Sequence, residues 1–131
     1  MKKSLILSAL GALALSVASS VSFAASHAAS ACLITKNNAN PFFVKMKEGA
    51  EAGAEKVGIK LSSYAGKVDG DAAPQITAIE NCIAAGAKGI LITPSNDSVA
   101  PALKKARAEG ILVIALDTQL ADPEAQDMTF A

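Results

Sequence analysis

Residues 86–116 read GAKGILITPSNDSVAPALKKARAEGILVIAL, and this stretch decides the fold. Two short, unbroken apolar runs, 89–93 and 111–116, have the length and composition of buried strands. The residues between them, from about 98 to 109, predict an amphipathic helix that ends at Gly110. Its apolar positions lie three and four residues apart: Val99, Leu103 and Ala106. A strand, a helix and a second strand in this order predict two parallel strands joined by a crossover helix.

The same alternation runs through the chain from residue 31. Further strands are predicted at 31–35 and from Ile59 to Tyr64. One upstream helix is predicted to begin at Asn40 and Pro41 and to end at Gly58. Its apolar stripe consists of Phe43, Met46, Ala50, Gly53, Ala54 and Val57. The other is opened by Asp71 and Pro74, closes at Gly86 and has its stripe at Ile76, Ile79 and Ile83.

Together these elements predict an α/β fold with a doubly wound parallel sheet in the order 2-1-3-4, covered by helices on both faces. Residues 128–131 resemble the start of a fifth strand. We therefore expect the chain to be an amino-terminal fragment of a larger protein.

The first 24 residues are predicted to be a cleaved secretory signal peptide. Lys2 and Lys3 precede an apolar run over 5–21, and the small residues of 22–24 suit a signal peptidase. A membrane anchor is the competing interpretation, but the run is short of the roughly 20 apolar residues that span a bilayer. The expected location of residues 25–131 is the periplasm.

The composition excludes several classes of function. Lys and Arg number 12, as do Asp and Glu, and 4% of residues are aromatic, which leaves neither a basic patch nor many stacking surfaces for nucleic acid. His27 is the single histidine and falls just after the leader, so a His-dependent catalytic pair or metal site is excluded. The loop after the first strand has no glycine-rich phosphate motif. We expect no catalytic residue, no metal and no cofactor.

Polar residues follow the predicted strands at the edge where ligands bind in such sheets. They supply amides and the carboxylate of Asp117, and the next helix begins with the rings of Phe42 and Phe43. Amides and a carboxylate can bond neighbouring hydroxyls, while a ring can cover the C–H face of a sugar. The combination suits a sugar. The polar loops are 36–40, 94–97 and 117–119.

Residues 40–50, NPFFVKMKEGA, together with Leu116-Asp117-Thr118, resemble the type I periplasmic sugar-binding proteins of ABC importers. Fructose-type members are the most similar, and ribose-binding proteins come next. The resemblance covers 31–131 and implies that 25–131 is the amino-terminal lobe of a two-lobed protein. Ribose binders usually carry Arg after the matching Asp, so Thr118 weakens ribose and is compatible with a fructose-type ligand. The residues implied to contact the sugar are Asn40, Phe42, Phe43 and Asp117.

The same resemblance implies a substrate-binding component that captures a fructose-like hexose or a pentose between its lobes and delivers it to inner-membrane permease subunits. A monomer with no nucleic-acid partner is expected. A receptor for chemotaxis or for a sensor kinase would have the same lobe. An α/β enzyme that uses Asp117 is a remote alternative, because neither a phosphate-binding loop nor a second acid accompanies that residue.

Each candidate also has a structural explanation. Asn40 can simply cap its helix, and Phe43 lies on the apolar stripe and can belong to the core. Phe42 lies off that stripe, which favours a cleft wall. Weaker ligand candidates are Asn38, Asn96 and Asp97, which loop and helix-start positions also favour.

The two cysteines are candidates for a disulfide. Cys32 starts the first strand, and Cys82 lies near the end of the second helix, which must cross that strand in a 2-1-3 order. Export to an oxidising compartment would permit the bond. Two separate buried thiols remain the alternative.

Overall fold

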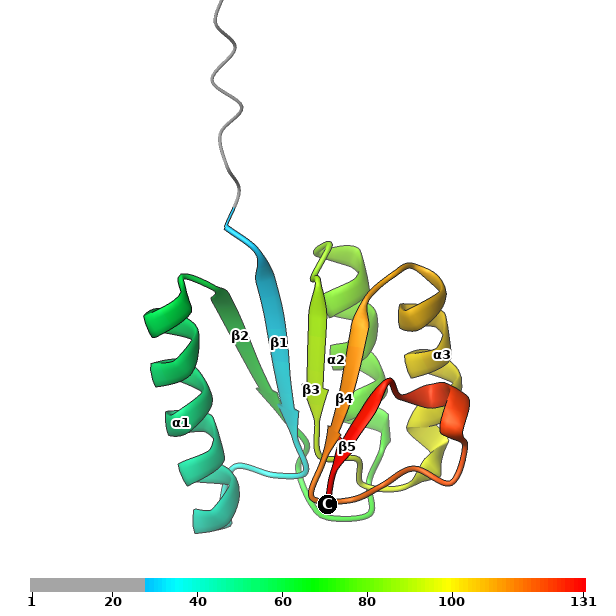
Figure 1. The fold of residues 1–131 in the computed structure, drawn as a ribbon. Helices are drawn as coiled ribbons and strands as arrows, with labels where there is room; N and C mark the ends of the chain where they lie inside the picture. Colours follow the sequence, from blue (N-terminus) through cyan, green and yellow to red (C-terminus); the bar gives the residue numbers. More distant parts are fainter. Residues whose placement is uncertain (1–27) are drawn as a thin grey trace, which may run out of the picture.

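The computed structural model describes residues 28–131, so the predicted signal peptide, 1–24, lies outside the described residues (Figure 1). Within them, five parallel strands form one sheet in the order β2-β1-β3-β4-β5. The strands are β1 (Ser30–Thr35), β2 (Lys60–Ala65), β3 (Gly89–Ile92), β4 (Leu112–Leu116) and β5 (Met128–Phe130). The helices are α1 (Pro41–Val57), α2 (Ala73–Ala84) and α3 (Ala100–Ala108), with short 3-10 helices η1 (Asp97–Val99) and η2 (Pro123–Ala125). The α/β class and the order 2-1-3-4 are confirmed, and β5 adds the fifth strand.

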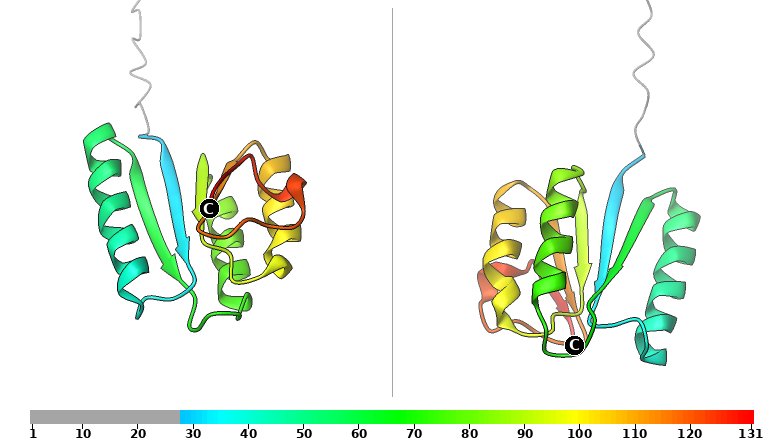
Figure 2. Two further views of the ribbon diagram at one scale, coloured as in Figure 1. Left: turned by 60° about the horizontal axis from the view of Figure 1, so that its bottom comes forward. Right: turned by 180° about the vertical axis from the view of Figure 1, so that it is seen from behind.

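The main core lies between the sheet and the helices α2 and α3, which share one face (Figure 2). It is built from apolar side chains that alternate strand positions direct to that face. Burying each Ile, Leu or Val of this kind contributes about 1.5–3 kcal/mol. Its largest members, each fully buried, are Ile34, Ile79, Ile90, Ile92, Leu103 and Val113.

Helix α1 covers only part of the opposite face. It packs on β1 and β2, and Phe43 is its one buried residue. Val57, at its last position, is 68% exposed. Met46, Ala50 and Ala54 of the predicted apolar stripe are partly buried, so the predicted stripe is wrong only at Gly53 and Val57, which are exposed.

The α1 side of β3, β4 and β5 lies open. Pairing places Leu116 opposite Phe130 and Ile114 opposite Met128, so these side chains share one face. Leu112, Met128 and Phe130 are 47%, 53% and 64% exposed. The prediction that helices cover both faces is thus wrong for this half of the sheet within residues 28–131. Parallel sheets are normally buried on both faces.

Several element boundaries differ from prediction by one or two residues, and two of these differences have a clear local reason. The N–H of Ile59 donates to the carbonyl of Ala54 as part of the left-handed end of α1, so β2 begins one residue later. The third helix starts at Ala100 and not near 98, because the Asn96 side chain accepts from the Ser98 N–H and a 3-10 turn forms first.

A disulfide joins β1 to α2. Cys32 and Cys82 are bonded across a Cα–Cα distance of 6.4 Å, and both are buried against the main core. The bond closes a loop with a sequence separation of 50 that contains α1 and β2. It therefore links the middle of the sheet covalently to the helix that crosses it.

The double variant Cys32→Ala/Cys82→Ala is expected to have a free energy of unfolding about 4 kcal/mol lower, because closing a loop of this length restricts the unfolded chain. Urea unfolding followed by circular dichroism measures the difference. As a control, reductant added to the unfolded protein should release two thiols from the unaltered chain and none from the variant. An unchanged unfolding midpoint would contradict the expectation.

Asp127 fastens the start of β5 to β4 and α3. Its Oδ2 accepts from the Val113 N–H at 2.8 Å, and its Oδ1 accepts from the Arg107 guanidinium at 2.7 and 3.0 Å. The Val113 N–H and the Arg107 cation hold the pKa of Asp127 below its usual value. The folded state is therefore stabilised by the ionised carboxylate.

Asp127→Asn should lower the free energy of unfolding by about 1–2 kcal/mol at pH 7, because the charge-assisted contacts are lost. Because the pKa of Asp127 is lower in the folded protein, its ionisation stabilises the fold above the pKa of the unfolded chain, which is about 4. This stabilisation is lost as the pH falls through the pKa of the folded protein. The difference in the free energy of unfolding between the unaltered chain and Asp127→Asn should therefore become smaller below pH 4, as measured by urea unfolding. Glu80→Gln, at an exposed glutamate on α2, is the control and should show no such pH-dependent gap.

Candidate functional site

The carboxyl ends of β1, β3 and β4 lie side by side at one edge of the sheet, the lower edge in Figure 1. Ile34 pairs with Ile92, and Ile92 pairs with Ala115, so the three strands end at the same level. The loops that follow them therefore meet in space although they are far apart in sequence. This is the edge at which open parallel sheets bind ligands.

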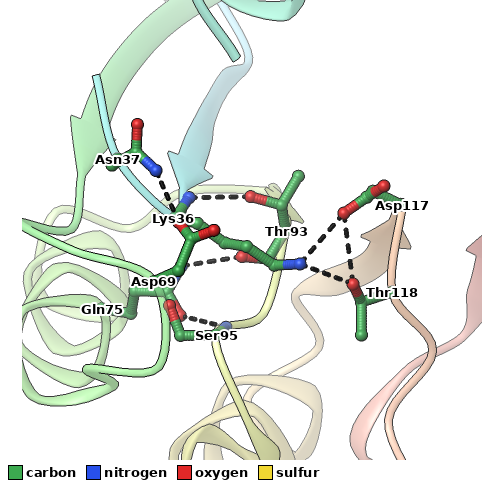
Figure 3. Close-up of polar contacts among 8 residues, drawn as sticks. All are labelled: Lys36, Asn37, Asp69, Gln75, Thr93, Ser95, Asp117 and Thr118. Carbon is green, nitrogen blue, oxygen red and sulfur yellow. Dashed lines mark hydrogen bonds and ion pairs between the residues drawn. The ribbon is translucent and has the colours of Figure 1, made fainter. Parts of the chain in front are cut away.

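Thr93 links the loop after β1 to the loop after β3 by hydrogen bonds (Figure 3). Its N–H donates to the carbonyl of Ile34 at 2.9 Å, which continues the β1–β3 ladder by one residue. Its hydroxyl accepts from the N–H of Lys36, also at 2.9 Å. Thr93 is fully buried, so both bonds are shielded from water. The direction in which the chain leaves β1 is fixed by this contact.

Gln75 holds the loop after β3 from the helix side. Its side chain is fully buried, its Nε2 donates to the Thr93 carbonyl at 2.8 Å, and its Oε1 accepts from the Ser95 N–H at 2.8 Å. One amide thus satisfies both backbone groups that flank Pro94. The sequence offered no signal for this role, since a single Gln on a helix is usually exposed.

Asp117 follows β4 in a strained conformation. Among the described residues, it is the one non-glycine residue with a positive φ, 64°. The Thr118 N–H donates to the Leu116 carbonyl at 2.6 Å, so Asp117 is the central residue of a three-residue turn. Its own N–H donates to the Phe130 carbonyl at 2.8 Å. Such backbone costs about 1–3 kcal/mol and clusters at functional sites.

Three side chains meet at this turn (Figure 3). The Lys36 ammonium lies 3.0 Å from Asp117 Oδ2 and donates to the Thr118 hydroxyl at 2.8 Å. The Thr118 hydroxyl donates to the same Oδ2 at 3.2 Å. Sequence reasoning placed Lys36 only in a polar loop and missed this contact, because the reach of a long side chain across two strands leaves no pattern in the sequence.

The predicted residues of α1 lie at the start of that helix, beyond the end of β1. Asn40 caps the helix, since its Oδ1 accepts from the Phe42 N–H at 3.0 Å. That bond leaves the Asn40 NH2 group free to donate elsewhere. Phe42 is 53% exposed, whereas Phe43 is buried and meets it edge to face with ring centres 5.2 Å apart. Asn40 and Phe42 can therefore contact a ligand without disturbing the core.

Phe43 and Asn38 line a hollow of about 350 Å³ between α1 and the strands β1 and β2. Thr35 and Tyr64 also line it, and Asp117 does not. The structure thus places Phe43 and Asp117 on different parts of the strand edge. Of the two rings, Phe42 is the one exposed at the helix start.

Asn37 shapes the loop after β1. Its Oδ1 accepts from the N–H groups of Ala39 and Asn40, at 3.0 and 2.8 Å, and its Nδ2 donates to Asp69 at 2.5 Å. This Asx turn delivers Asn40 to its capping position. Asn37 was not singled out from the sequence, although Asn at a strand exit is a typical turn signal.

Asn96 and Asp97 bind other loops of the protein. Asn96 Nδ2 donates to the Gly70 carbonyl at 2.7 Å while its Oδ1 caps η1. Asp97 Oδ1 accepts from the Ala121 N–H at 2.8 Å. Their hydrogen bonds fasten the loop after β3 to those after β2 and β4.

Within residues 28–131, no helix is long and apolar enough to cross a membrane. In the same residues, His, Cys, Asp and Glu side chains do not gather in groups of three or more that could hold a metal ion.

Gln75→Leu is expected to lower the free energy of unfolding by about 3 kcal/mol, because two buried backbone groups lose their partner. Urea unfolding measures the change, and the amide NMR signal of Ser95 should shift. Thr77→Ala is the control on the same helix, since that exposed hydroxyl bonds only the carbonyl of Ala73. A loss no larger than that of the control would contradict the bridging role.

Comparison with known proteins gives a consistent result. Residues 31–131 match the model of a family described as periplasmic binding protein domain. The ribose import binding protein RbsB of Bacillus subtilis is 34% identical over 79 residues, which are 60% of this chain and 25% of that protein. The D-ribose/D-allose-binding protein of Pseudomonas aeruginosa is 33% identical over 95 residues, 70% of this chain and 30% of that protein.

A solved structure shows the same fold. The periplasmic solute-binding protein of an ABC transporter from Actinobacillus succinogenes, with bound D-allose, superposes with a TM-score of 0.68 at 30% identity, over 74% of this chain and 34% of that one. The chain therefore spans between 25% and 34% of the length of these proteins. Both the strand order and the family match lead to one conclusion: this chain belongs to the periplasmic binding protein family, a family of binding proteins and not of enzymes.

Proposed function

We propose that this chain is the amino-terminal sugar-binding lobe of the periplasmic component of a carbohydrate ABC importer. Residues 1–24 serve as its signal peptide, and residues 25–131 form the lobe. The supporting observation is that a free amide, an exposed ring and a carboxylate follow strand ends at one edge of the sheet: Asn40, Phe42 and Asp117.

These groups suit a sugar because a sugar presents hydroxyls at its rim and C–H bonds on its faces. The Asn40 NH2 and the Asp117 carboxylate provide a donor and an acceptor for hydroxyls. The Phe42 ring, 53% exposed, provides apolar surface for a C–H face. Phe43, which is buried, supports Phe42 through its edge-to-face contact and completes the proposed set.

Asn38, Asn96 and Asp97 remain secondary candidates. Asn38 is exposed beside the α1 hollow. Asn96 and Asp97 already bond backbone groups, so a contribution to binding would use their remaining atoms.

The proposed ligand is a monosaccharide, either a pentose or a hexose. The relatives are named for ribose and allose, which favours an aldose of this kind. Thr118, in the position where ribose binders usually carry Arg, keeps a fructose-like hexose in the proposal.

Capture follows from closure of two lobes around the sugar, and permease subunits in the inner membrane then receive it. Micromolar binding by a complete site corresponds to about −8 kcal/mol, so half of that energy predicts binding by this chain in the millimolar range. The buried Cys32–Cys82 bond is consistent with an oxidising compartment.

Titration of the exported chain with D-ribose, D-allose and D-fructose, followed by amide NMR, tests the proposal. We expect saturable shifts at Asn40, Phe42 and Asp117 with a Kd of roughly 1 mM. Asn40→Ser keeps a capping oxygen and removes the NH2 group, so affinity should fall about fivefold with little loss of stability.

Phe42→Ala should weaken binding to a similar extent, because the apolar wall is lost. Val57→Ala, at the far end of the same helix and also exposed to solvent, is the control and should bind as the unaltered chain does. If none of the three sugars shifts the resonances at the strand edge, the proposed function is wrong.

A further inference from the structure

The Cys32–Cys82 bond joins two parts of the chain that contribute very unequally to the core. Between residues 36 and 65, which include α1 and β2, Phe43 is the one buried residue. Residues 72–131 supply the main core, to which residues 28–71 add only Cys32 and Ile34 as buried members. We call residues 30–65 the first half and residues 72–131 the second half. The first half therefore has little core of its own and relies on its contact with the second half.

The two halves meet at a seam formed by the pairing of β1 with β3 and by the packing of β1 on α2. At one end of the seam the Lys88 N–H donates to the Ser30 carbonyl at 2.7 Å. At the other end the Thr93 N–H donates to the Ile34 carbonyl at 2.9 Å. Hydrogen bonds and the side chains of Ile34 and Cys32 thus hold the seam together, and the disulfide crosses it.

The disulfide changes what opening of this seam requires. Cys82 is fully buried, so as long as α2 stays packed the bond holds Cys32 close to its native position on β3. With the bond intact, β1 cannot leave β3 unless α2 moves with it, which breaks up the core of the second half. Without the bond, β1 can leave while α2 and α3 still share that core.

We propose that the Cys32–Cys82 bond is a redox switch that controls the seam between two cooperative units of the chain. In the reduced chain the first half detaches and returns as a unit while the second half stays folded. In the oxidised chain the two halves open only together. Units that open separately, each with its own free energy, are common in small domains. Because thiols stay reduced in the cytosol and pair in oxidising compartments, the switch of an exported chain closes after translocation.

Closing the switch is a thiol–disulfide exchange with a disulfide donor of the oxidising compartment. The thiolate of one cysteine attacks the donor, which forms a mixed disulfide and releases one donor thiolate. The thiolate of the other cysteine then attacks the mixed disulfide, so that the Cys32–Cys82 bond forms and the second donor thiolate leaves. In total, two electrons and two protons pass from the two cysteines to the donor, which becomes two thiols.

The seam also divides the candidate site. Asn40 and Phe42 belong to the first half, whereas Asp117 belongs to the second. These residues share one edge only while the seam is closed, so the switch decides for how long that edge stays assembled. The inference does not depend on what the edge binds.

Hydrogen exchange of the oxidised and the reduced exported chain, followed by amide NMR without sugar, tests the inference. The reduced form is prepared in denaturant and refolded with reductant present, because the bond is buried in the folded chain. The N–H groups of Lys88 and Thr93 report on the seam. The matched control is the N–H of Leu112, which donates to the Lys88 carbonyl at 3.0 Å within the second half.

In the reduced form, the protection factors of Lys88 and Thr93 should be about tenfold or more below that of Leu112, because the first half detaches alone. In the oxidised form, the three values should agree within about threefold, because one opening exposes all three groups. Cys32→Ala/Cys82→Ala should show the reduced pattern without reductant, and reductant should not change it.

Two results would overturn the inference. Equal protection of the three groups in the reduced form, or its loss at all three, means that the chain opens as one unit. A tenfold difference that is present in the oxidised form as well means that the bond does not control the seam. Both results leave the proposed function untouched, since the sugar titration tests it separately.

Discussion

The parallel pairing of β1 with β2 on one side and β3 on the other is the constraint on which the rest of the structure depends. It sets Cys32 toward α2 and Leu33 toward α1, and it ends β1 level with β3 so that Thr93 can bind the Lys36 N–H. A slip of one residue would turn every side chain of β1 to the other face. The disulfide, the core and the polar edge would then all be lost together.

Much of the fold was predictable from the sequence because its signals are local. Unbroken apolar runs such as Gly89–Ile92 and glycines with positive φ, such as Gly58, mark strands and helix ends without reference to distant residues. What surrounds an element is not a local property, however. The apolar stripe of α1 predicted burial as far as Val57, and the runs in β4 and β5 predicted cover on both faces, yet both depend on packing that residues 28–131 do not provide.

The location of the candidate site was predictable from the sequence, but the hydrogen bonds and the ion pair that hold it together were not. Topology alone places the strand exits at one edge, and a resemblance to a known family indicated Asn40, Phe42, Phe43 and Asp117. The positive φ of Asp117 was not predicted, because Asp adopts such a backbone more often than most non-glycine residues but still rarely. The reach of Lys36 to Asp117 and the bridge made by Gln75 depend on side-chain directions, which become defined only once the strands are paired.

Burial of the Cys32–Cys82 bond has a kinetic consequence. Both sulfur-bearing residues are at most 3% exposed, so a dissolved thiol cannot attack either sulfur while β1 and α2 remain packed. Cleavage must wait for a transient local opening of the core. The rate at which a reductant cleaves this disulfide therefore measures how often the centre of the sheet opens locally. The measurement needs neither a label nor a denaturant.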